Sequence, residues 1–373
     1  MVAAKYRAEQ VGSFLRPREV LEARAAYALG EISLEKLREI ENAAILKALE
    51  VQKETGIDVY SDGELRRGSF LSDLGEAVEG FVPDTVAMEW HGPTESDGPE
   101  GSVAQVVGAR LRQTRRLTAH ESDFLRQHAP GAFKMTIPSP TLFTDVSYKP
   151  GLSDRFYPTR SDLLQDIVPI INGEIRALAS EGVRYIQIDA PRYLYYVDPR
   201  LREHLRETGV DPDQALDEAI AADNQALAGA KQAAPAPDEV TLALHLCRGN
   251  SRSRWFAEGG YDQIAEKLFG SLQVDALLLE YDSDRAGGFE PLRFVRPGTT
   301  VVLGLITTKE PRLESQEVLR RRIDEASRYV PIENLAISPQ CGFASIAAGN
   351  LLSADDQRRK LELVVETARK VWG

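Results

Sequence analysis

The stretch Val240-Thr-Leu-Ala-Leu-His-Leu246 is an apolar run that is short enough for one buried strand and ends in polar residues. The same kind of run recurs along the chain, and amphipathic segments of helical period lie between the runs. Working outward from 240–246, we expect eight strands, at 8–11, 57–61, 133–137, 185–188, 240–246, 276–280, 300–306 and 335–338. We expect helices at 18–55 with a break near Gly30, and at 160–181, 212–230, 261–269, 316–329 and 353–371.

Eight strands that alternate with helices predict an α/β protein with a (β/α)8 TIM barrel, formed as one domain over 1–373. The extra length is expected in insertions, the largest at about 73–130, where the alternating stretch Ser102 to Arg112 suggests a hairpin. A second excursion covers 141–161. A doubly wound open sheet is the rival architecture, and we rank it lower because no Gly-x-Gly-x-x-Gly follows the first strand.

The composition excludes several classes of protein. The chain has 373 residues, with 45 Lys and Arg against 57 Asp and Glu and a net charge of −12, which argues against a nucleic-acid surface. Its only cysteines are Cys247 and Cys341, too few for a disulfide scaffold, and no segment has the pattern of a secretion signal or a membrane helix. We therefore expect a cytoplasmic protein without membrane or nucleic-acid partners.

The scarce metal-binding side chains follow expected strands. His245 and Cys247 share one face of the fifth strand, with Cα atoms roughly 6.5 Å apart. Glu280 ends the sixth strand and Cys341 follows the eighth. Because the carboxyl ends of barrel strands share one mouth, these side chains predict a Zn²⁺ site. The alternative is that the cysteines are buried small apolar residues without a metal.

Seven segments make the chain resemble a known family. They are 11–14 (VGSF), 62–67 (DGELRR), 187–191 (QIDAP), 244–250 (LHLCRGN), 279–281 (LEY), 303–306 (LGLI) and 338–342 (SPQCG). Together they resemble the catalytic half of the cobalamin-independent methionine synthase superfamily, and most of all its short single-barrel members. The resemblance implies zinc ligands at His245, Cys247, Glu280 and Cys341. It also implies that Glu64 and Asp189 bind the amine of homocysteine and that Gly12 and Ser13 receive its carboxylate. In isolation, three of these residues have a structural alternative: a loop cap for Asp189, an ion pair with Arg66 or Arg67 for Glu64, and a turn for Gly12.

The ligand set indicates the chemistry. A zinc ion with two thiolates, one imidazole and one carboxylate carries a formal charge of about −1, which suits activation of a substrate thiol better than hydrolysis. The expected reaction is therefore transfer of a methyl group to a small-molecule thiol, with homocysteine as the expected acceptor, to give methionine. Adding an epoxide or other alkyl electrophile to a thiol such as coenzyme M is the main alternative. A non-catalytic zinc-binding protein and a metal-free decarboxylase on the related uroporphyrinogen decarboxylase barrel are the others.

Two departures leave the methyl donor open. The long folate-using enzymes have an additional N-terminal barrel that this chain lacks, so the donor is either a methyl-folate or a methyl-corrinoid carried by a partner protein. Lys309 stands in the region where the long enzymes carry a histidine. It is either a catalytic acid, a group that binds an anionic part of the donor, or a solvated lysine. The sequence leaves the oligomeric state open, including a homo-oligomer.

Overall fold

The computed structural model describes residues 5–92 and 100–373. Six parallel strands form a continuous sheet in the order β3-β4-β5-β6-β7-β8. Their bounds are Met135–Pro138, Tyr185–Asp189, Thr241–Leu246, Ala276–Glu280, Thr300–Ile306 and Leu335–Pro339. Every one of these strands overlaps an expected strand, and β6 and β7 have the expected bounds.

Two short segments close this sheet into a barrel. Ala8 forms a parallel bridge with Ile337 of β8, and Tyr60 forms one with Phe133, next to β3. The two segments also meet each other, because the Asp58 N–H donates to the Ala8 carbonyl at 2.9 Å. The expected strands at 8–11 and 57–61 therefore exist only as single bridges, yet they occupy the first two positions of a closed (β/α)8 barrel.

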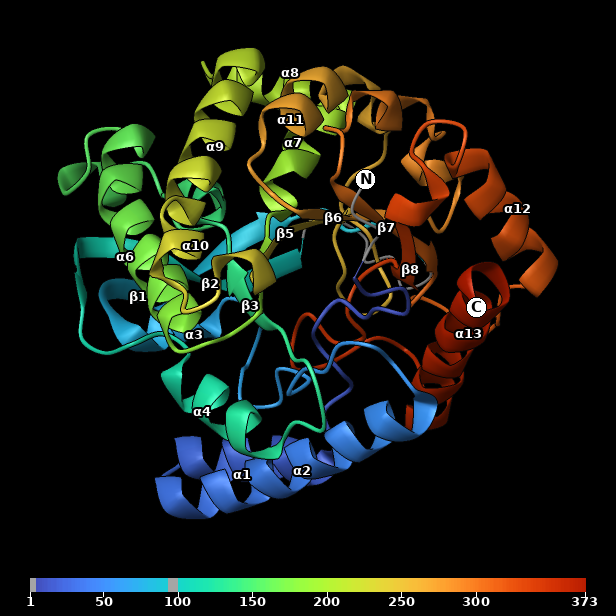
Figure 1. Cartoon of the computed structure of the whole chain (residues 1–373). Coiled ribbons are helices and arrows are strands. Elements are labelled where there is room, and N and C mark those ends of the chain that lie inside the picture. Colours follow the sequence, from blue (N-terminus) through green and yellow to red (C-terminus); the bar gives the residue numbers. More distant parts are fainter. Residues whose placement is uncertain (1–4, 93–99) are drawn as a thin grey trace.

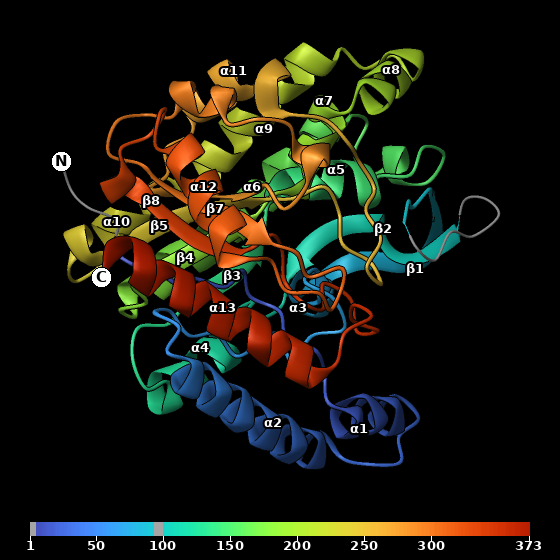
Figure 2. The same ribbon diagram turned by 90° about the vertical axis from the view of Figure 1, so that its right-hand side faces the viewer.

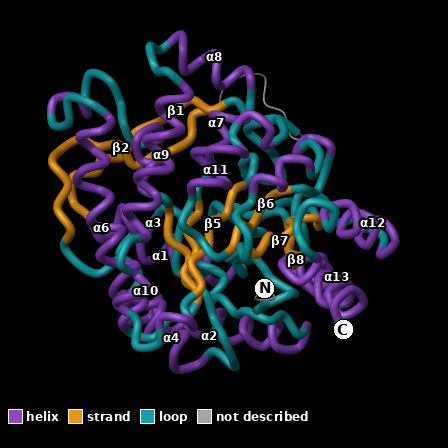
Figure 3. The backbone as a smooth tube through the Cα atoms, turned by 45° about the horizontal axis from the view of Figure 1, so that its top comes forward, coloured by secondary structure: helices purple, strands orange, loops and turns teal. Residues whose placement is uncertain are grey.

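The helices surround the strands, as Figures 1 and 3 show. The longer ones are α1 (Arg18–Ala28), α2 (Leu34–Thr55), α4 (Ala119–His128), α6 (Arg160–Ser180), α8 (Pro199–Glu207), α9 (Pro212–Leu227), α12 (Gln316–Ala326) and α13 (Ala354–Trp372). The shorter ones are α3 (Ser72–Ala77), α5 (Phe143–Val146), α7 (Leu194–Val197), α10 (Ala230–Ala233) and α11 (Ala265–Ser271). The break near Gly30 separates α1 from α2, and the Ser33 side chain caps α2 by accepting from the Lys36 N–H.

The core has two parts. A small cluster fills the barrel interior and includes Val11, Val59, Tyr185, Leu278 and Val302. A much larger apolar cluster lies between the strands and the helices. The interior is thus packed with side chains, as in other barrels of this class, and leaves the carboxyl ends of the strands as the place for a site. In the described residues, no helix is long and apolar enough to cross a membrane.

The expected hairpin within 102–112 is wrong in one respect. That stretch forms a single strand, β2 (Glu100–Gln113), which pairs antiparallel with β1 (Val78–Met88). The alternation of side chains along 102–112 marked a strand but gave no information on its partner, which lies earlier in the chain. The β1–β2 hairpin extends away from the barrel strands in Figure 2. Residues 93–99, within the expected insertion, lie outside the described part of the chain.

The hairpin is joined to the loop that follows β5. His91, just beyond β1, pairs antiparallel with Trp255, and the two residues exchange backbone hydrogen bonds of 2.8 and 2.9 Å. The segment after β1 therefore reaches the carboxyl side of the barrel and contributes to its wall.

Candidate metal and substrate site

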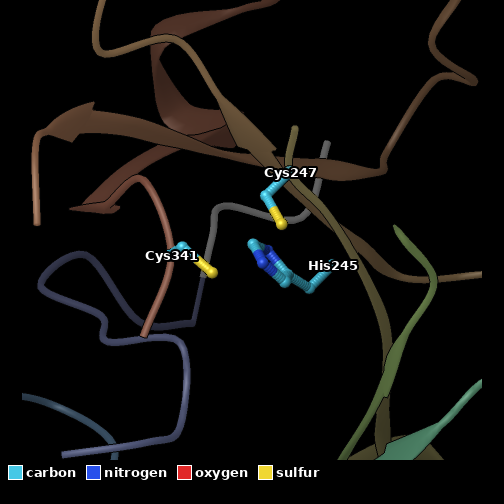
Figure 4. Close-up of side chains that lie close together, drawn as sticks. All are labelled: His245, Cys247 and Cys341. Atoms are coloured by element: carbon cyan, nitrogen blue, oxygen red, sulfur yellow. The ribbon is translucent and has the colours of Figure 1, made fainter. Parts of the chain in front are cut away.

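Three of the expected metal ligands lie together at the barrel mouth. His245 is on β5, Cys247 follows that strand directly, and Cys341 lies in the loop after β8. One His245 ring nitrogen and the two Sγ atoms all lie within 4.8 Å of one another, and all three residues are buried. Figure 4 shows the two sulfur atoms and the imidazole ring pointing toward one another. The cysteines are free thiols, as expected.

The chemistry of this cluster fits a soft divalent metal. Both ring nitrogens of His245 are buried and have no hydrogen-bond partner among the described residues, which is costly unless a ligand satisfies them. Two sulfurs and one imidazole are the donors that Zn²⁺ prefers. The pKa of Cys341 is held well below its usual value by the neighbouring Cys247 thiol and then by His245. The site thus already favours a thiolate.

Glu280, the fourth expected ligand, does not belong to this group of close ligand atoms. It is fully buried at the end of β6, where its Oε2 accepts from the Arg248 N–H at 2.6 Å. Its Oε1 lies 3.3 Å from a guanidinium nitrogen of Arg285. Glu280 nevertheless lies close enough to raise the pKa of His245, together with the larger influences of Cys341 and Asp189, against the opposing effect of burial.

A cavity of about 710 Å³ opens beside the cluster. Its lining includes the three candidate metal ligands together with Ser13, Glu64 and Asp189. The rest of its wall is mostly apolar and aromatic, with Phe70, Phe81, Trp90, Phe143, Tyr195 and Phe256. The hairpin supplies Phe81, and the segment that follows β1 supplies Trp90. Gly12, Glu280 and Lys309 are not part of this lining.

Glu64 presents one carboxylate oxygen that no described residue engages. Its Oε1 accepts a hydrogen bond from the Thr136 hydroxyl at 2.9 Å, whereas its buried Oε2 has no partner. Glu64 also has a left-handed backbone, with φ of 56°, which is uncommon for a residue with a side chain and is concentrated at functional sites. Gly12 makes room for this carboxylate, because a Cβ at Gly12 would lie 2.7 Å from Glu64 Oε1.

Asp189 lies at the end of β4, where it is the register partner of His245 on β5. Its Oδ1 accepts from the Gln187 side-chain amide at 2.8 Å. Burial is the main reason that its pKa rises to about 7, and the charge of Glu64 adds to this shift while His245 opposes it. Asp189 thus lies beside His245 of the candidate metal cluster, and both line the cavity together with Glu64.

Ser13 lies against the loop that carries Cys341. A Cβ at Gly342 would lie 2.0 Å from Ser13 Oγ, and the Phe343 N–H donates to the Ser13 carbonyl at 2.8 Å. The Ala344 N–H also points to Ser13 Oγ, at 3.4 Å. The segment 12–13 and the loop after β8 are therefore in direct contact, so Ser13 is held within reach of the metal-binding side.

Lys309 lies behind the cavity wall. Its ammonium donates to the Gly249 carbonyl at 3.0 Å, to Asn250 Oδ1 at 3.2 Å and to the Arg254 carbonyl at 3.3 Å. An ammonium has three protons, and these three acceptors use them all. In this arrangement Lys309 holds the loop that begins with Cys247.

Several residues near the site had no functional role in the sequence interpretation. Arg67 and Gln187 stand in two of the motifs quoted above, but Arg67 entered only as an alternative ion-pair partner of Glu64, and Gln187 received no role. The structure does bring Arg67 to 3.8 Å from Glu64 Oε1. Thr136 and Lys134 carried no signal of their own, because a threonine and a lysine within an expected strand are ordinary. Their importance depends on contacts between different strands, which a single sequence does not reveal.

Comparisons with known proteins identify the family and agree with the fold. Residues 7–370 match the family model described as the catalytic domain of cobalamin-independent synthase. The uncharacterized protein YxjG of Bacillus subtilis is 40% identical over 98% of this chain and 95% of its own length. The methionine synthase of Saccharolobus solfataricus is 25% identical over 97% of this chain and 93% of its length. The solved structure of a putative vitamin-B12 independent methionine synthase from Listeria monocytogenes is 30% identical, with a TM-score of 0.72, and the match covers 100% of this chain and 99% of that one.

Proposed function

Since the chain belongs to the cobalamin-independent methionine synthase family, whose enzymes transfer methyl groups, we propose that it is a zinc-dependent methyltransferase that converts homocysteine to methionine. The observation that carries the proposal is the buried group of His245, Cys247 and Cys341 at one end of a cavity that also contains Glu64 and Asp189. A soft-metal cluster and a pair of carboxylates are what a thiol that also bears an amine requires.

His245, Cys247 and Cys341 would hold the metal, with Glu280 as the fourth ligand. When bound, zinc lowers the pKa of a substrate thiol and so keeps its sulfur a nucleophile at neutral pH. Arg285 and the Arg248 N–H hold the Glu280 carboxylate in the arrangement described above, so a metal bound through Glu280 would share the carboxylate with Arg285 or displace it. Arg285 then helps to set how strongly this site binds the metal.

The two carboxylates at the cavity would receive the substrate ammonium. Glu64 contributes its unpartnered Oε2, and Asp189 contributes the oxygen that does not accept from Gln187. The Ser13 hydroxyl and the backbone at Gly12 would receive the substrate carboxylate. These contacts fix the amino-acid end, so the sulfur lies toward the cysteines while the apolar wall receives the group that carries the methyl.

In the reaction, a sulfur–methyl bond forms as the bond between the methyl carbon and its carrier breaks. The electron pair of that bond stays with the carrier, which is either a methyl-folate, whose nitrogen then takes a proton, or a methyl-corrinoid on a partner protein. For Lys309 to supply that proton, its ammonium would have to release one of three hydrogen bonds. We therefore propose that Lys309 supplies a proton only if the methyl carrier is a folate, whose nitrogen needs one.

The test combines zinc-loaded protein with homocysteine or coenzyme M, and offers each thiol methyl-folate, methylcobalamin or a simple epoxide. We expect methionine as the product, identified by mass. A thioether formed from coenzyme M and the epoxide, without methionine, would support alkyl addition instead. If no pairing yields a thioether, the proposed methyl transfer is wrong.

A further inference from the structure

Two buried cations, Arg67 and Lys134, each contact a neutral side chain that in turn donates a hydrogen bond to one of the two cavity carboxylates. Arg67 donates to the Thr136 hydroxyl at 3.0 Å, and that hydroxyl donates to Glu64. Lys134 donates to the Gln187 side-chain oxygen at 3.0 Å, and the amide of that side chain donates to Asp189. Each carboxylate is thus connected to a cation through one neutral side chain, and Arg67 also lies 3.8 Å from Glu64 Oε1 directly.

The strand register brings these two chains of hydrogen bonds together. Thr136 on β3 and Gln187 on β4 are register partners. Lys134 is two residues before Thr136, and Asp189 is two residues after Gln187, so all four side chains share the interior face of the barrel. The arrangement follows from the alternation of two neighbouring strands.

The direction of each hydrogen bond is fixed by the chemistry of its donor. The Thr136 hydroxyl has one proton, and because Arg67 can only donate, that proton is directed to Glu64 Oε1. An ammonium also only donates, so the Gln187 oxygen faces Lys134. The two amide protons of Gln187 then go to the Val11 carbonyl at 2.7 Å and to Asp189 Oδ1.

Both cations are themselves held by buried acids. Arg67 binds Glu121 through two nitrogens, at 3.1 and 2.7 Å, and Lys134 lies 3.0 Å from Glu9. All four of these charged residues are almost entirely buried, so none has freedom to turn. The two neutral side chains are therefore rigid donors, and each fixes one oxygen of a carboxylate while leaving the other for a ligand.

We propose that Thr136 and Gln187, held by Arg67 and Lys134, are positioning residues that give the site its preference for thiols with an α-amino group. This inference rests on the proposed function, because it assumes that Glu64 and Asp189 receive the ammonium. It adds that the preference depends on residues that never touch the substrate. A carboxylate that is free to rotate would bind the ammonium less well, whereas the sulfur and the substrate carboxylate would bind as before.

The test compares L-homocysteine with 4-mercaptobutanoate, which is the same thiol without its amino group. Binding of each to zinc-loaded protein is measured by calorimetry, which needs no methyl donor. The variants are Thr136→Val and Gln187→Met, which remove the donated hydrogen bond with little change in volume. Thr136→Ser retains the hydroxyl and is the matched control. Zinc content is measured for every variant.

We expect Thr136→Val and Gln187→Met each to weaken homocysteine binding by about tenfold, which corresponds to a lost hydrogen bond to a charged group. Binding of 4-mercaptobutanoate should change less than about twofold, and Thr136→Ser should retain the preference. If the variants keep the preference of the wild-type protein, or weaken both thiols equally, the positioning role is wrong while the proposed function stands. If the wild-type protein itself binds both thiols equally, the proposed amine site is wrong as well.

Discussion

Glu280 Oε1 and a guanidinium nitrogen of Arg285 lie 3.3 Å apart at the end of β6, and Glu280 is fully buried. This carboxylate is not among the mutually close ligand atoms of His245, Cys247 and Cys341. A metal at Glu280 would share this carboxylate with Arg285 or displace the guanidinium, so the ion pair weakens what the carboxylate offers to the metal. The competition makes opposite predictions for the two residues.

Glu280→Gln should weaken zinc binding by at least about tenfold, because an amide is a much poorer zinc ligand than a carboxylate. Arg285→Met should leave zinc affinity unchanged or raise it, because it releases Glu280 from its ion pair. Competition with a chelator of known affinity measures both. Cys341→Ala, which removes a sulfur of the central group, is the reference for loss of a ligand. Wild-type affinity in Glu280→Gln would remove Glu280 from the ligand set.

Gly342→Ala should weaken binding of the substrate through its effect on Ser13. The new methyl group would lie 2.0 Å from Ser13 Oγ, so either the hydroxyl or the loop after β8 has to move. We expect the KM for homocysteine to rise at least about tenfold while zinc content stays near that of the wild-type protein. Gly173→Ala is the matched control, because it lies within α6 and a Cβ there meets no atom within 4 Å. Equal KM values for the two variants would exclude this role for the contact.

Lys309 allows a test of its two proposed roles. Lys309→Met removes three hydrogen bonds to the loop of 249–254 and should lower the thermal midpoint and the zinc affinity together. If Lys309 only holds this loop, Lys309→Met should reduce turnover with methyl-folate and with methylcobalamin by similar factors. If Lys309 also donates a proton, Lys309→Met should reduce turnover with methyl-folate more than turnover with methylcobalamin. The variant's rate with methyl-folate should also no longer show the fall at high pH that deprotonation of a catalytic acid causes. Steady-state rates with the two donors across pH distinguish the outcomes.

The sequence predicted the barrel because its signal is local and repeated. Each strand from β3 to β8 is an apolar run, and runs such as 276–280 and 300–306 carry their own boundaries. The candidate metal ligands could be proposed for the same reason, since His245 lies near the end of one strand, Cys247 follows that strand and Cys341 follows another. The extent of the first two strands was harder to predict. In the structure Ala8 and Tyr60 each make only a single bridge to a neighbouring strand.

What the sequence did not reveal depends on contacts between distant segments. The partner of β2 is an earlier strand, the ion pair of Glu280 is with Arg285 in the following loop, and Lys309 bonds a loop some 55 to 60 residues before it. Thr136 and Gln187 gain their meaning only from the register of β3 and β4. Neither the periodicity of apolar residues nor the amino-acid composition indicates which hydrogen-bond donor faces which acceptor across a barrel.

The buried Asp62 should make the stability of the protein depend on pH. Burial, followed by the charge of Glu121, raises its pKa from 3.8 to about 7. Its Oδ1 accepts from the Glu64 N–H at 2.9 Å, whereas its buried Oδ2 has no partner. Between these two pKa values the unfolded chain has lost a proton that the folded protein still holds. The free energy of unfolding therefore falls as pH rises from about 4 to about 7, and the loss is complete above that range.

Asp62→Asn should remove this dependence, because an amide does not titrate and its oxygen can still accept from the Glu64 N–H. Each unit of pKa shift is worth about 1.4 kcal/mol, so the variant should gain up to about 4 kcal/mol relative to the wild-type protein between pH 4 and pH 8. The quantity compared is how the difference in unfolding free energy between the two proteins changes with pH. A constant cost of burying the amide does not change with pH, and the pH dependence of zinc binding is common to both proteins, so neither contributes to it. Urea unfolding of both proteins from pH 4 to pH 8.5 at fixed ionic strength measures the difference. A difference that stays constant across this range would mean that Asp62 is already ionised in the folded protein.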